Sequence, residues 1–228
     1  MDIDRSIYTV FSLRGLKLGS EEARAFVLGA YACAIQKSIG HIISHVIFEE
    51  CNSAAEDPAI VSMMSTLVTR MGKAGVRCGF ITNSFKKLAE SDAGRVLLDN
   101  IGLKFFGPID SSSIPLLNET MAVPVDMLQK CAAPTFLTDK TQGKMNILVS
   151  ENGRNTITQF FPGWISSALN ASHRFEGEAK HAFFQTIPDK NVALSAFSLY
   201  FRACCETGKA VQVLPSETIK DYENLCQY

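Results

Sequence analysis

Short apolar runs and amphipathic stretches alternate along the first hundred residues. The runs are rich in β-branched and aromatic residues, which predicts strands at 7–13, 44–48, 76–82 and 103–106. Between them, apolar residues recur at helical spacing, which predicts helices from 20 to about 37, from 58 to near 70, and from 85 to 99. Strands and helices in alternation are typical of an α/β protein with a mostly parallel sheet flanked by helices.

The second half of the chain has a different texture. Prolines and serines divide residues 111–142 into short apolar pieces, with one short helix predicted at 125–130. Asn152-Gly153 predicts a hairpin turn between strands at 145–150 and 155–161. Two helices at 164–173 and 189–206, and a short last helix in the polar tail 215–228, complete the prediction. We therefore divide the chain into residues 1–110 and a C-terminal portion, 111–228, of the same domain.

Composition excludes several classes of protein. The 228 residues carry a net charge of −1, so no strong field of one sign indicates nucleic acid or an anionic membrane as partner. No apolar run is long enough to predict a transmembrane helix, and the acidic start of the chain is unlike a signal peptide. The seven cysteines show no zinc-binding spacing, which favours a reducing cytoplasm.

Two adjacent carboxylates follow the buried run at 44–48. In open α/β sheets, ligands bind at the carboxyl ends of the strands. Glu49 and Glu50 therefore come where one acid can hold Mg²⁺ and the next can polarise a water molecule. The simpler alternative is a strand that ends in a solvated acidic loop, and these residues alone favour that alternative.

An ordered set of motifs resembles the type IV secretion ATPases, the family of the fourth VirB protein, TraC and TrwK, and especially its Dot/Icm branch. Phe48-Glu49-Glu50 resembles the Walker B motif, with Glu in place of the usual Asp. The helix end from Val68 to Gly75 resembles the basic helix end that precedes the next strand of the family. Ile81-Thr82-Asn83-Ser84 resembles its Thr-Gln strand end, with Asn in place of Gln. The resemblance implies part of a RecA-like P-loop NTPase sheet.

The resemblance also implies roles for individual residues. Glu49 would anchor Mg²⁺ through water and Glu50 would activate the attacking water. Thr82 and Asn83 would orient that water or sense the γ-phosphate of ATP.

Three basic residues are further candidates for cofactor binding. Arg70 and Lys73 would reach the phosphates held by a neighbouring subunit, as an arginine finger does, although basic residues are also usual at a solvated helix C-terminus. Arg154, in the predicted turn, would face a partner.

The largest departure from the family is the missing phosphate-binding loop. No G-x-x-x-x-G-K-[ST] occurs, and Gln142-Gly143-Lys144-Met145 lacks the hydroxyl that would bind Mg²⁺. The resemblance therefore implies the C-terminal part of a larger ATPase, which alone would be inactive and would bind ATP weakly. In RecA-like sheets the phosphate-loop strand is central, so its absence would expose strand edges that favour pairing with another chain.

Two functions follow as expectations. The first is the Walker B and sensor half of a hexameric ATPase that uses ATP and Mg²⁺ to energise protein transport, conjugation or apparatus assembly from the cytoplasmic side of the inner membrane. The second is a non-catalytic interaction module that docks to secretion-apparatus proteins. Expected partners are a homo-oligomer or the full-length ATPase, other secretion ATPases and inner-membrane components.

Overall fold

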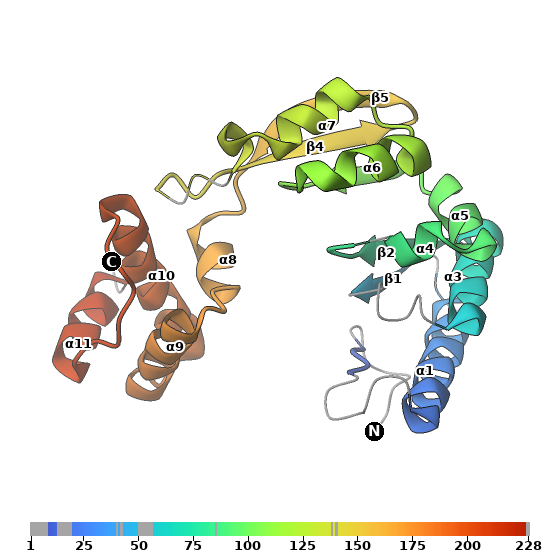
Figure 1. Ribbon diagram of the computed structural model, residues 1–228. Helices are drawn as coiled ribbons and strands as arrows, with labels where there is room; N and C mark the ends of the chain where they lie inside the picture. Colours follow the sequence, from blue (N-terminus) through green and yellow to red (C-terminus); the bar gives the residue numbers. More distant parts are fainter. Residues whose placement is uncertain are drawn as a thin grey trace. The chain divides into compact units, whose positions relative to one another are not determined.

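The chain folds into two compact units, seen in a computed structural model (Figure 1). The structure describes residues 9–12, 20–39, 41, 43–49, 57–84, 86–137, 139 and 141–226. One unit comprises Met1–Lys104 with Pro115–Val123, and the other comprises Phe105–Ile114 with Pro124–Tyr228. The α/β class predicted from the sequence is confirmed.

The first unit contains the parallel strands. Its elements up to residue 99 are α1 (Glu21–Ile39), β1 (Ser44–Glu49), α3 (Pro58–Met71), η2 (Gly72–Ala74), β2 (Val76–Ile81), α4 (Lys86–Ala89) and α5 (Asp92–Asp99). β1 and β2 pair in parallel, with Ser44 opposite Val76 and Glu49 opposite Ile81. Of the predicted strand at 7–13, residues 9–12 are described and form no strand, and the rest lies outside the described residues.

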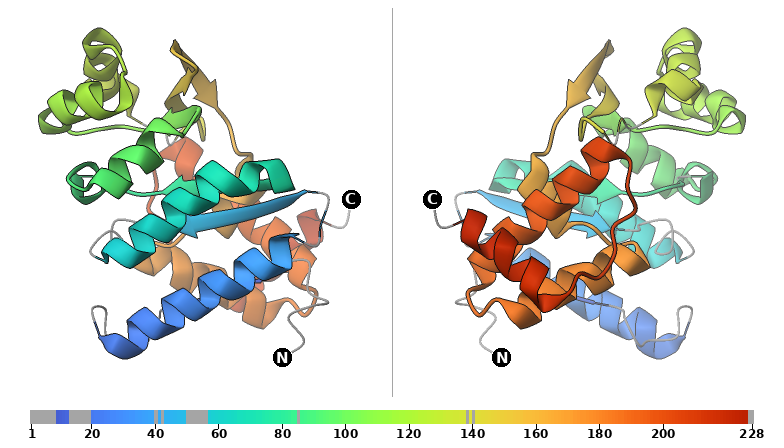
Figure 2. Two further views of the ribbon diagram at one scale, coloured as in Figure 1. Left: turned by 90° about the vertical axis from the view of Figure 1, so that its right-hand side faces the viewer. Right: turned by 90° about the vertical axis from the view of Figure 1, so that its left-hand side faces the viewer.

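α1 and α3 cover one face of this sheet. They lie side by side in front of the strands in the left view of Figure 2, and to one side of the strands in Figure 1. The buried side chains of the strands are Val46, Phe48 and Val76. Residues of the opposite parity, such as Ile47 and Ile81, are exposed, as expected for strands whose side chains alternate between two faces.

α3 begins where its sequence predicts. Asp57 is the N-cap, and its carboxylate accepts a hydrogen bond from the Ala59 amide at 2.9 Å, while Pro58 occupies the first helical position. The same carboxylate lies 2.6 Å from the Arg24 guanidinium, which ties the start of α3 to α1.

The single helix predicted at 85–99 is instead two helices, α4 and α5. Ser91 interrupts it, because its hydroxyl accepts a hydrogen bond from the Gly94 amide at 3.0 Å and so caps α5. The backbone of Gly94 lies directly against the carbonyl group of Leu88. A side chain at this position would separate the two helices.

The prediction that residues 103–106 belong to the parallel sheet is wrong. β3 (Leu103–Phe106) lies in a second sheet of order β3-β4-β5, with β4 (Met145–Glu151) and β5 (Arg154–Phe160). Pairing depends on distant parts of the chain, which a four-residue apolar run does not reveal. The predicted β4–β5 hairpin is confirmed, and its turn residues Asn152 and Gly153 have φ of 48° and 81°, as the favoured two-residue turn requires.

Short helices connect β3 to this hairpin. They are η3 (Ser111–Ser113), α6 (Ile114–Met121), α7 (Val125–Ala132) and η4 (Pro134–Phe136). α7 confirms the helix predicted at 125–130, whereas the sequence did not predict α6. Pro115 lies in the first turn of α6, where proline is tolerated because no intrahelical partner is needed for its missing N–H.

A tight loop precedes β4. The Asp139 carboxylate accepts hydrogen bonds from the Thr141 hydroxyl at 2.6 Å and from the Thr141 amide at 3.0 Å, and the hydroxyl bond lowers the pKa of Asp139. Gly143 has φ of 63° and lies against the rings of Phe161 and Trp164. These two rings meet edge to face, with centroids 6.2 Å apart.

Four helices with a shared core end the described chain (Figure 2, right view). They are α8 (Trp164–Leu169), α9 (Arg174–Thr186), α10 (Lys190–Thr207) and α11 (Ser216–Leu225). The predicted helix at 164–173 ends at Leu169, and α9 was not predicted. α10 and α11 confirm the predicted last helices. Lys180 donates hydrogen bonds to the carbonyls of Leu169 and Ala171, at 2.7 and 2.9 Å, and so satisfies the end of α8.

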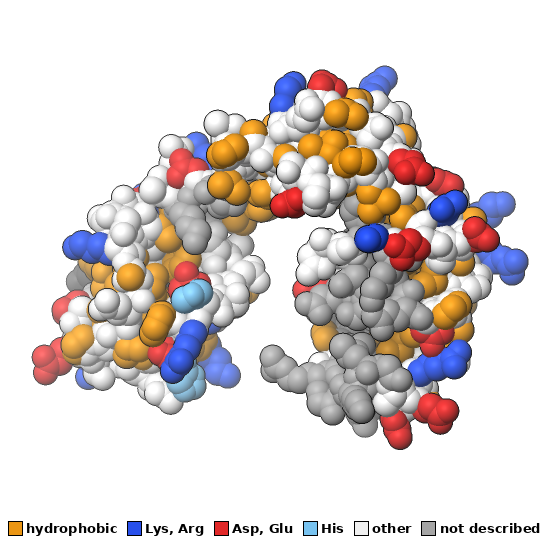
Figure 3. Space-filling model, in the orientation of Figure 1, with side chains coloured by type: hydrophobic (Ala, Val, Ile, Leu, Met, Phe, Trp, Pro, Cys, Tyr) orange, Lys and Arg blue, Asp and Glu red, His pale blue; other side chains and the backbone are white. Residues whose placement is uncertain are grey.

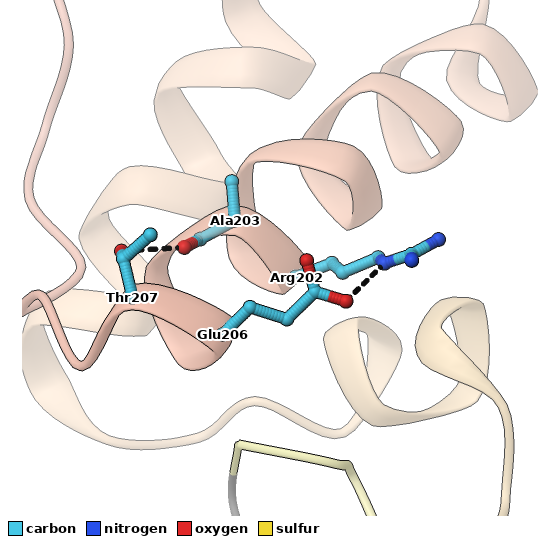
Figure 4. A network of polar contacts seen from close by, with 4 residues as sticks. All are labelled: Arg202, Ala203, Glu206 and Thr207. Carbon is cyan, nitrogen blue, oxygen red and sulfur yellow. Dashed lines mark hydrogen bonds and ion pairs between the residues drawn. The ribbon is translucent and has the colours of Figure 1, made fainter.

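The last two turns of α10 carry a polar network on their surface (Figure 4). Arg202 pairs with Glu206 at 2.7 Å, and the Thr207 hydroxyl donates to the carbonyl of Ala203 at 2.6 Å. Exposed pairs of this kind add only a few tenths of a kcal/mol, so the helix depends mainly on its buried face.

Tyr200 fastens the segment between α10 and α11. Its hydroxyl accepts a hydrogen bond from the Gln212 amide and donates one to the Gln212 carbonyl, both at 2.9 Å. Burial raises the pKa of Tyr200, because it disfavours the charged phenolate. The phenol therefore stays protonated and able to donate at neutral pH.

We expect Tyr200→Phe to lower the free energy of unfolding by about 1–2 kcal/mol, because two backbone groups of Gln212 lose their partner. A group whose pKa is raised by folding stabilises the fold below its unfolded pKa, and this stabilisation is lost as pH rises. The wild type should therefore lose stability more steeply than Tyr200→Phe above about pH 10. Urea unfolding at neutral and alkaline pH measures both effects, with Tyr222→Phe from the same cluster as control. Equal alkaline slopes would contradict the role of Tyr200.

Candidate functional site

The candidate site is the edge of the first unit at which β1 and β2 end. Because these strands are parallel and Glu49 lies opposite Ile81, Glu49 is at the same edge as Thr82 and Asn83, which follow β2. Glu49 and Asn83 are exposed and Thr82 is half-buried. The two strand ends therefore bring an acid to the same edge as two polar residues. Glu50 lies outside the described residues.

Aromatic rings support this edge from the helix-covered face. Phe48 stacks on Phe80 across the two strands, with centroids 5.0 Å apart, and Tyr31 of α1 meets Phe48 edge to face at 4.9 Å. These contacts come directly before Glu49 and Thr82, so they fix the register of the strand ends. This aromatic support was not predicted from the sequence, although Phe48 and Phe80 occupy corresponding positions in their predicted strands.

Thr82 closes a small turn at the end of β2. Its hydroxyl donates to the Ser84 carbonyl at 2.5 Å and accepts from the Ser84 amide at 3.1 Å. With these two bonds the hydroxyl shapes the loop and leaves the Asn83 side chain at its exposed tip. Asn83 is thus the better placed of the two to meet a ligand.

Arg70 and Lys73 lie at the other end of the sheet. Both are exposed, Arg70 in the last turn of α3 and Lys73 in η2, which leads into the start of β2. The six residues of β2 separate that end from the candidate site by about 16 Å. The structure does not bring these two cations together with Glu49.

Arg154 belongs to the second unit. It is the first residue of β5 and lies opposite Glu151 in the hairpin, with its side chain exposed. Its predicted contact with a partner stays a prediction.

A pocket of about 170 Å³ lies beside β2. It is lined by Val76, Cys78 and Phe80 of the strand, by Val68 of α3, and by residues 100–103. Burial raises the pKa of the Cys78 thiol, so this cysteine stays protonated at neutral pH and is a poor nucleophile. The pocket offers apolar contact and no evident chemistry.

Within the described part of the chain, no group of three or more His, Cys, Asp or Glu residues is placed to hold a metal ion. Nor is any helix among these residues long and apolar enough to cross a membrane. In the face seen in Figure 3, acidic and basic side chains are interspersed rather than gathered by sign. The candidate site therefore provides oxygen ligands at one sheet edge but no preformed cage for a cation.

Comparison of the chain with protein-family models, with curated proteins and with solved structures gives no match.

Proposed function

We propose that this chain provides the Walker B and sensor residues of an ATPase domain of the type IV secretion kind, which energises substrate transfer or apparatus assembly. The observation that supports the proposal is the parallel register of β1 and β2, which brings Glu49 to the same sheet edge as Thr82 and Asn83. An acid beside a polar strand end is the arrangement that phosphoryl transfer uses to hold Mg²⁺ and orient water.

The ligand chemistry of this edge suits Mg²⁺ bound together with a nucleotide. Mg²⁺ prefers oxygen ligands and is commonly held by one or two carboxylates, several waters and the phosphates of a substrate. Glu49 supplies one exposed carboxylate and Asn83 a carboxamide oxygen. In this proposal Glu49 holds the ion through water, Asn83 orients the attacking water, and Thr82 keeps Asn83 in place. Glu50 would polarise that water.

The same proposal predicts weak binding of ATP to this chain by itself. A phosphate-binding loop supplies backbone amides and a lysine that hold the phosphates, and the sequence has no such motif. A second segment, in the same or another polypeptide, would complete the site. Arg70 and Lys73, at the far end of the sheet, would then act only on the nucleotide of a neighbouring subunit. The assembled ATPase would work at the cytoplasmic side of the inner membrane.

The second candidate function is an interaction module without catalysis. It is favoured by the apolar pocket along β2 and by the exposed Ile47 and Ile81 on the sheet, because parallel sheets are normally covered on both faces. Such a module would dock to secretion-apparatus proteins or to a full-length ATPase.

Paramagnetic broadening by Mn²⁺ tests the site directly. With saturating ATP and a trace of Mn²⁺ in place of Mg²⁺, we expect the amide signals of Glu49, Asn83 and Ser84 to broaden in the NMR spectrum of the labelled chain. In Glu49→Gln the broadening should fall several-fold, because the amide does not attract the cation as the carboxylate does.

The matched control is Glu151→Gln, which neutralises an exposed acid at the end of another strand, β4. This change should leave the broadening at β1 and β2 unaltered. Broadening centred elsewhere, or undiminished in Glu49→Gln, would contradict the Walker B assignment and leave the interaction module as the better proposal.

A further inference from the structure

One face of the β1–β2 sheet is exposed. Val46 and Phe48, which point toward the helices, are at most 9% exposed, whereas Ile47 and Ile81 on the opposite face are 65% and 55% exposed. Gly79 lies opposite Ile47 and two residues before Ile81 on β2, and it leaves the middle of the face flat. Because parallel sheets are normally buried on both faces, this apolar surface is suited to contact another protein surface.

The two ends of the face carry side chains of opposite character, basic at one end and acidic at the other. His45 and Arg77 lie side by side at the end where the strands begin, and both are exposed. Glu49 lies at the end where they finish, beside Ile81. The face therefore runs from a basic row, across an apolar centre, to an acidic end.

We propose that this face binds a second copy of the same chain, with the strands of the two copies running in opposite directions. A twofold axis through the centre then places Glu49 of each copy opposite His45 of the other and diagonal to its Arg77, and places Ile47 opposite its own equivalent. Such self-complementarity is what a twofold interface requires. In the alternative twofold arrangement the strands run in the same direction, so the two Arg77 side chains come close and repel each other, and Glu49 meets Ile81 instead of a basic residue.

The described face is small, and this sets the strength of the dimer. Two strands of six residues cover roughly 20 Å by 10 Å, well below the roughly 800 Å² per partner of a stable interface. We therefore expect dimers only at concentrations of about 100 µM and above. Their charge pairs make association sensitive to salt. The inference does not rest on the proposed ATPase function, and a Glu49 carboxylate paired across this interface would not hold Mg²⁺ at the same time.

Analytical ultracentrifugation of the whole chain tests this arrangement. The wild type should move from its monomer mass of 25.0 kDa toward twice that mass as concentration rises, and 0.5 M NaCl should reverse the shift. Glu49→Lys should weaken dimerisation by about tenfold or more, because it removes the acid from the basic row of the other copy and brings a cation close to Arg77 there. The double variant His45→Glu, Arg77→Glu should do the same, since it places acids opposite Glu49.

An equal mixture of Glu49→Lys with the His45→Glu, Arg77→Glu variant should associate again, because every charge then meets its opposite. Glu151→Lys, at an exposed position of the hairpin, is the control and should dimerise like the wild type. If circular dichroism shows that either charge variant fails to fold, Ile47→Asp at the centre of the face serves instead, and it should also weaken dimerisation. A wild type that stays monomeric, a mixture that does not associate, or association indifferent to charge and salt would overturn the proposal.

Discussion

Phe183→Ala is expected to lower the free energy of unfolding of the helical cluster α8–α11 by about 3–5 kcal/mol. Phe183 is fully buried, and its ring meets those of Phe197, Tyr200 and Tyr222 at centroid distances of 5.5, 5.8 and 6.1 Å. Alanine removes the apolar area and leaves a cavity that these rings cannot all move to fill. Because the free energy of unfolding of native domains is only about 5–15 kcal/mol, this one change should remove a large share of it.

Urea unfolding followed by residue-resolved hydrogen exchange measures the effect and shows where it acts. Amides of α9 and α10 should exchange faster, while those of β1 and β2 in the first unit should be unaffected. The control is Phe175→Ala, on the same helix but 57% exposed, which we expect to cost less than about 1 kcal/mol. Equal losses for the two phenylalanines would show that burial in the cluster is not what stabilises it.

Gly94→Ala should destabilise the first unit by about 3 kcal/mol or more. A methyl group at Gly94 would overlap the carbonyl oxygen of Leu88 and come within 2.7 Å of its carbon. Both are backbone atoms, so relief requires α4 and α5 to move apart, and Leu88 and Leu97 are buried there. Thermal unfolding followed by circular dichroism gives the measurement.

Gly29→Ala is the matched control, since Gly29 lies within α1 and has nothing within 4 Å of an added methyl group. There we expect stabilisation of about 0.5–1 kcal/mol, because alanine favours the helix and restricts the unfolded chain. If both glycine variants behave alike, the close approach at Leu88 does not hold α4 and α5 together.

Local patterns predicted the elements that carry strong local signals. Asp57-Pro58 marks the start of α3 through a side-chain cap and a fixed φ, and Asn152-Gly153 marks the hairpin through residues that tolerate positive φ. β1 and β2 were predicted because their apolar runs are short, β-branched and bounded by turns. In each case a few neighbouring residues determine the conformation.

Elements with weak local signals were missed. α9 fully buries only Ala179 and Phe183, and charged residues at 174, 176, 178 and 180 alternate with its apolar ones, so its helical period was overlooked. α6 begins at Ile114, and Pro115 in its first turn is also typical of a loop, although proline suits a first helical turn. The sheet to which β3 belongs depends on β4, which begins 39 residues after β3 ends, and no short window of sequence reveals such a pairing.

The strand ends of the candidate site were predicted, and the roles of their residues stay predictions. Glu49 was predicted at the end of one strand and Thr82-Asn83 at the end of the next, and the parallel register of β1 and β2 brings both ends to one edge of the sheet. The sequence could not show that the Thr82 hydroxyl is engaged by Ser84, nor that Arg70 and Lys73 lie at the opposite end. Those facts depend on loop geometry and on the direction in which α3 returns along the sheet.

The contact of Trp164 with Gly143 makes the chain convenient for optical work. Trp164 is the sole tryptophan, and its ring lies at the junction of the loop before β4 with the start of α8, next to Phe161. Excitation at 295 nm therefore excites only Trp164, which lies in the second unit, and no residue of the β1–β2 sheet. Emission from that indole reports opening of the junction alone, so it separates melting of one unit from melting of the other without any label.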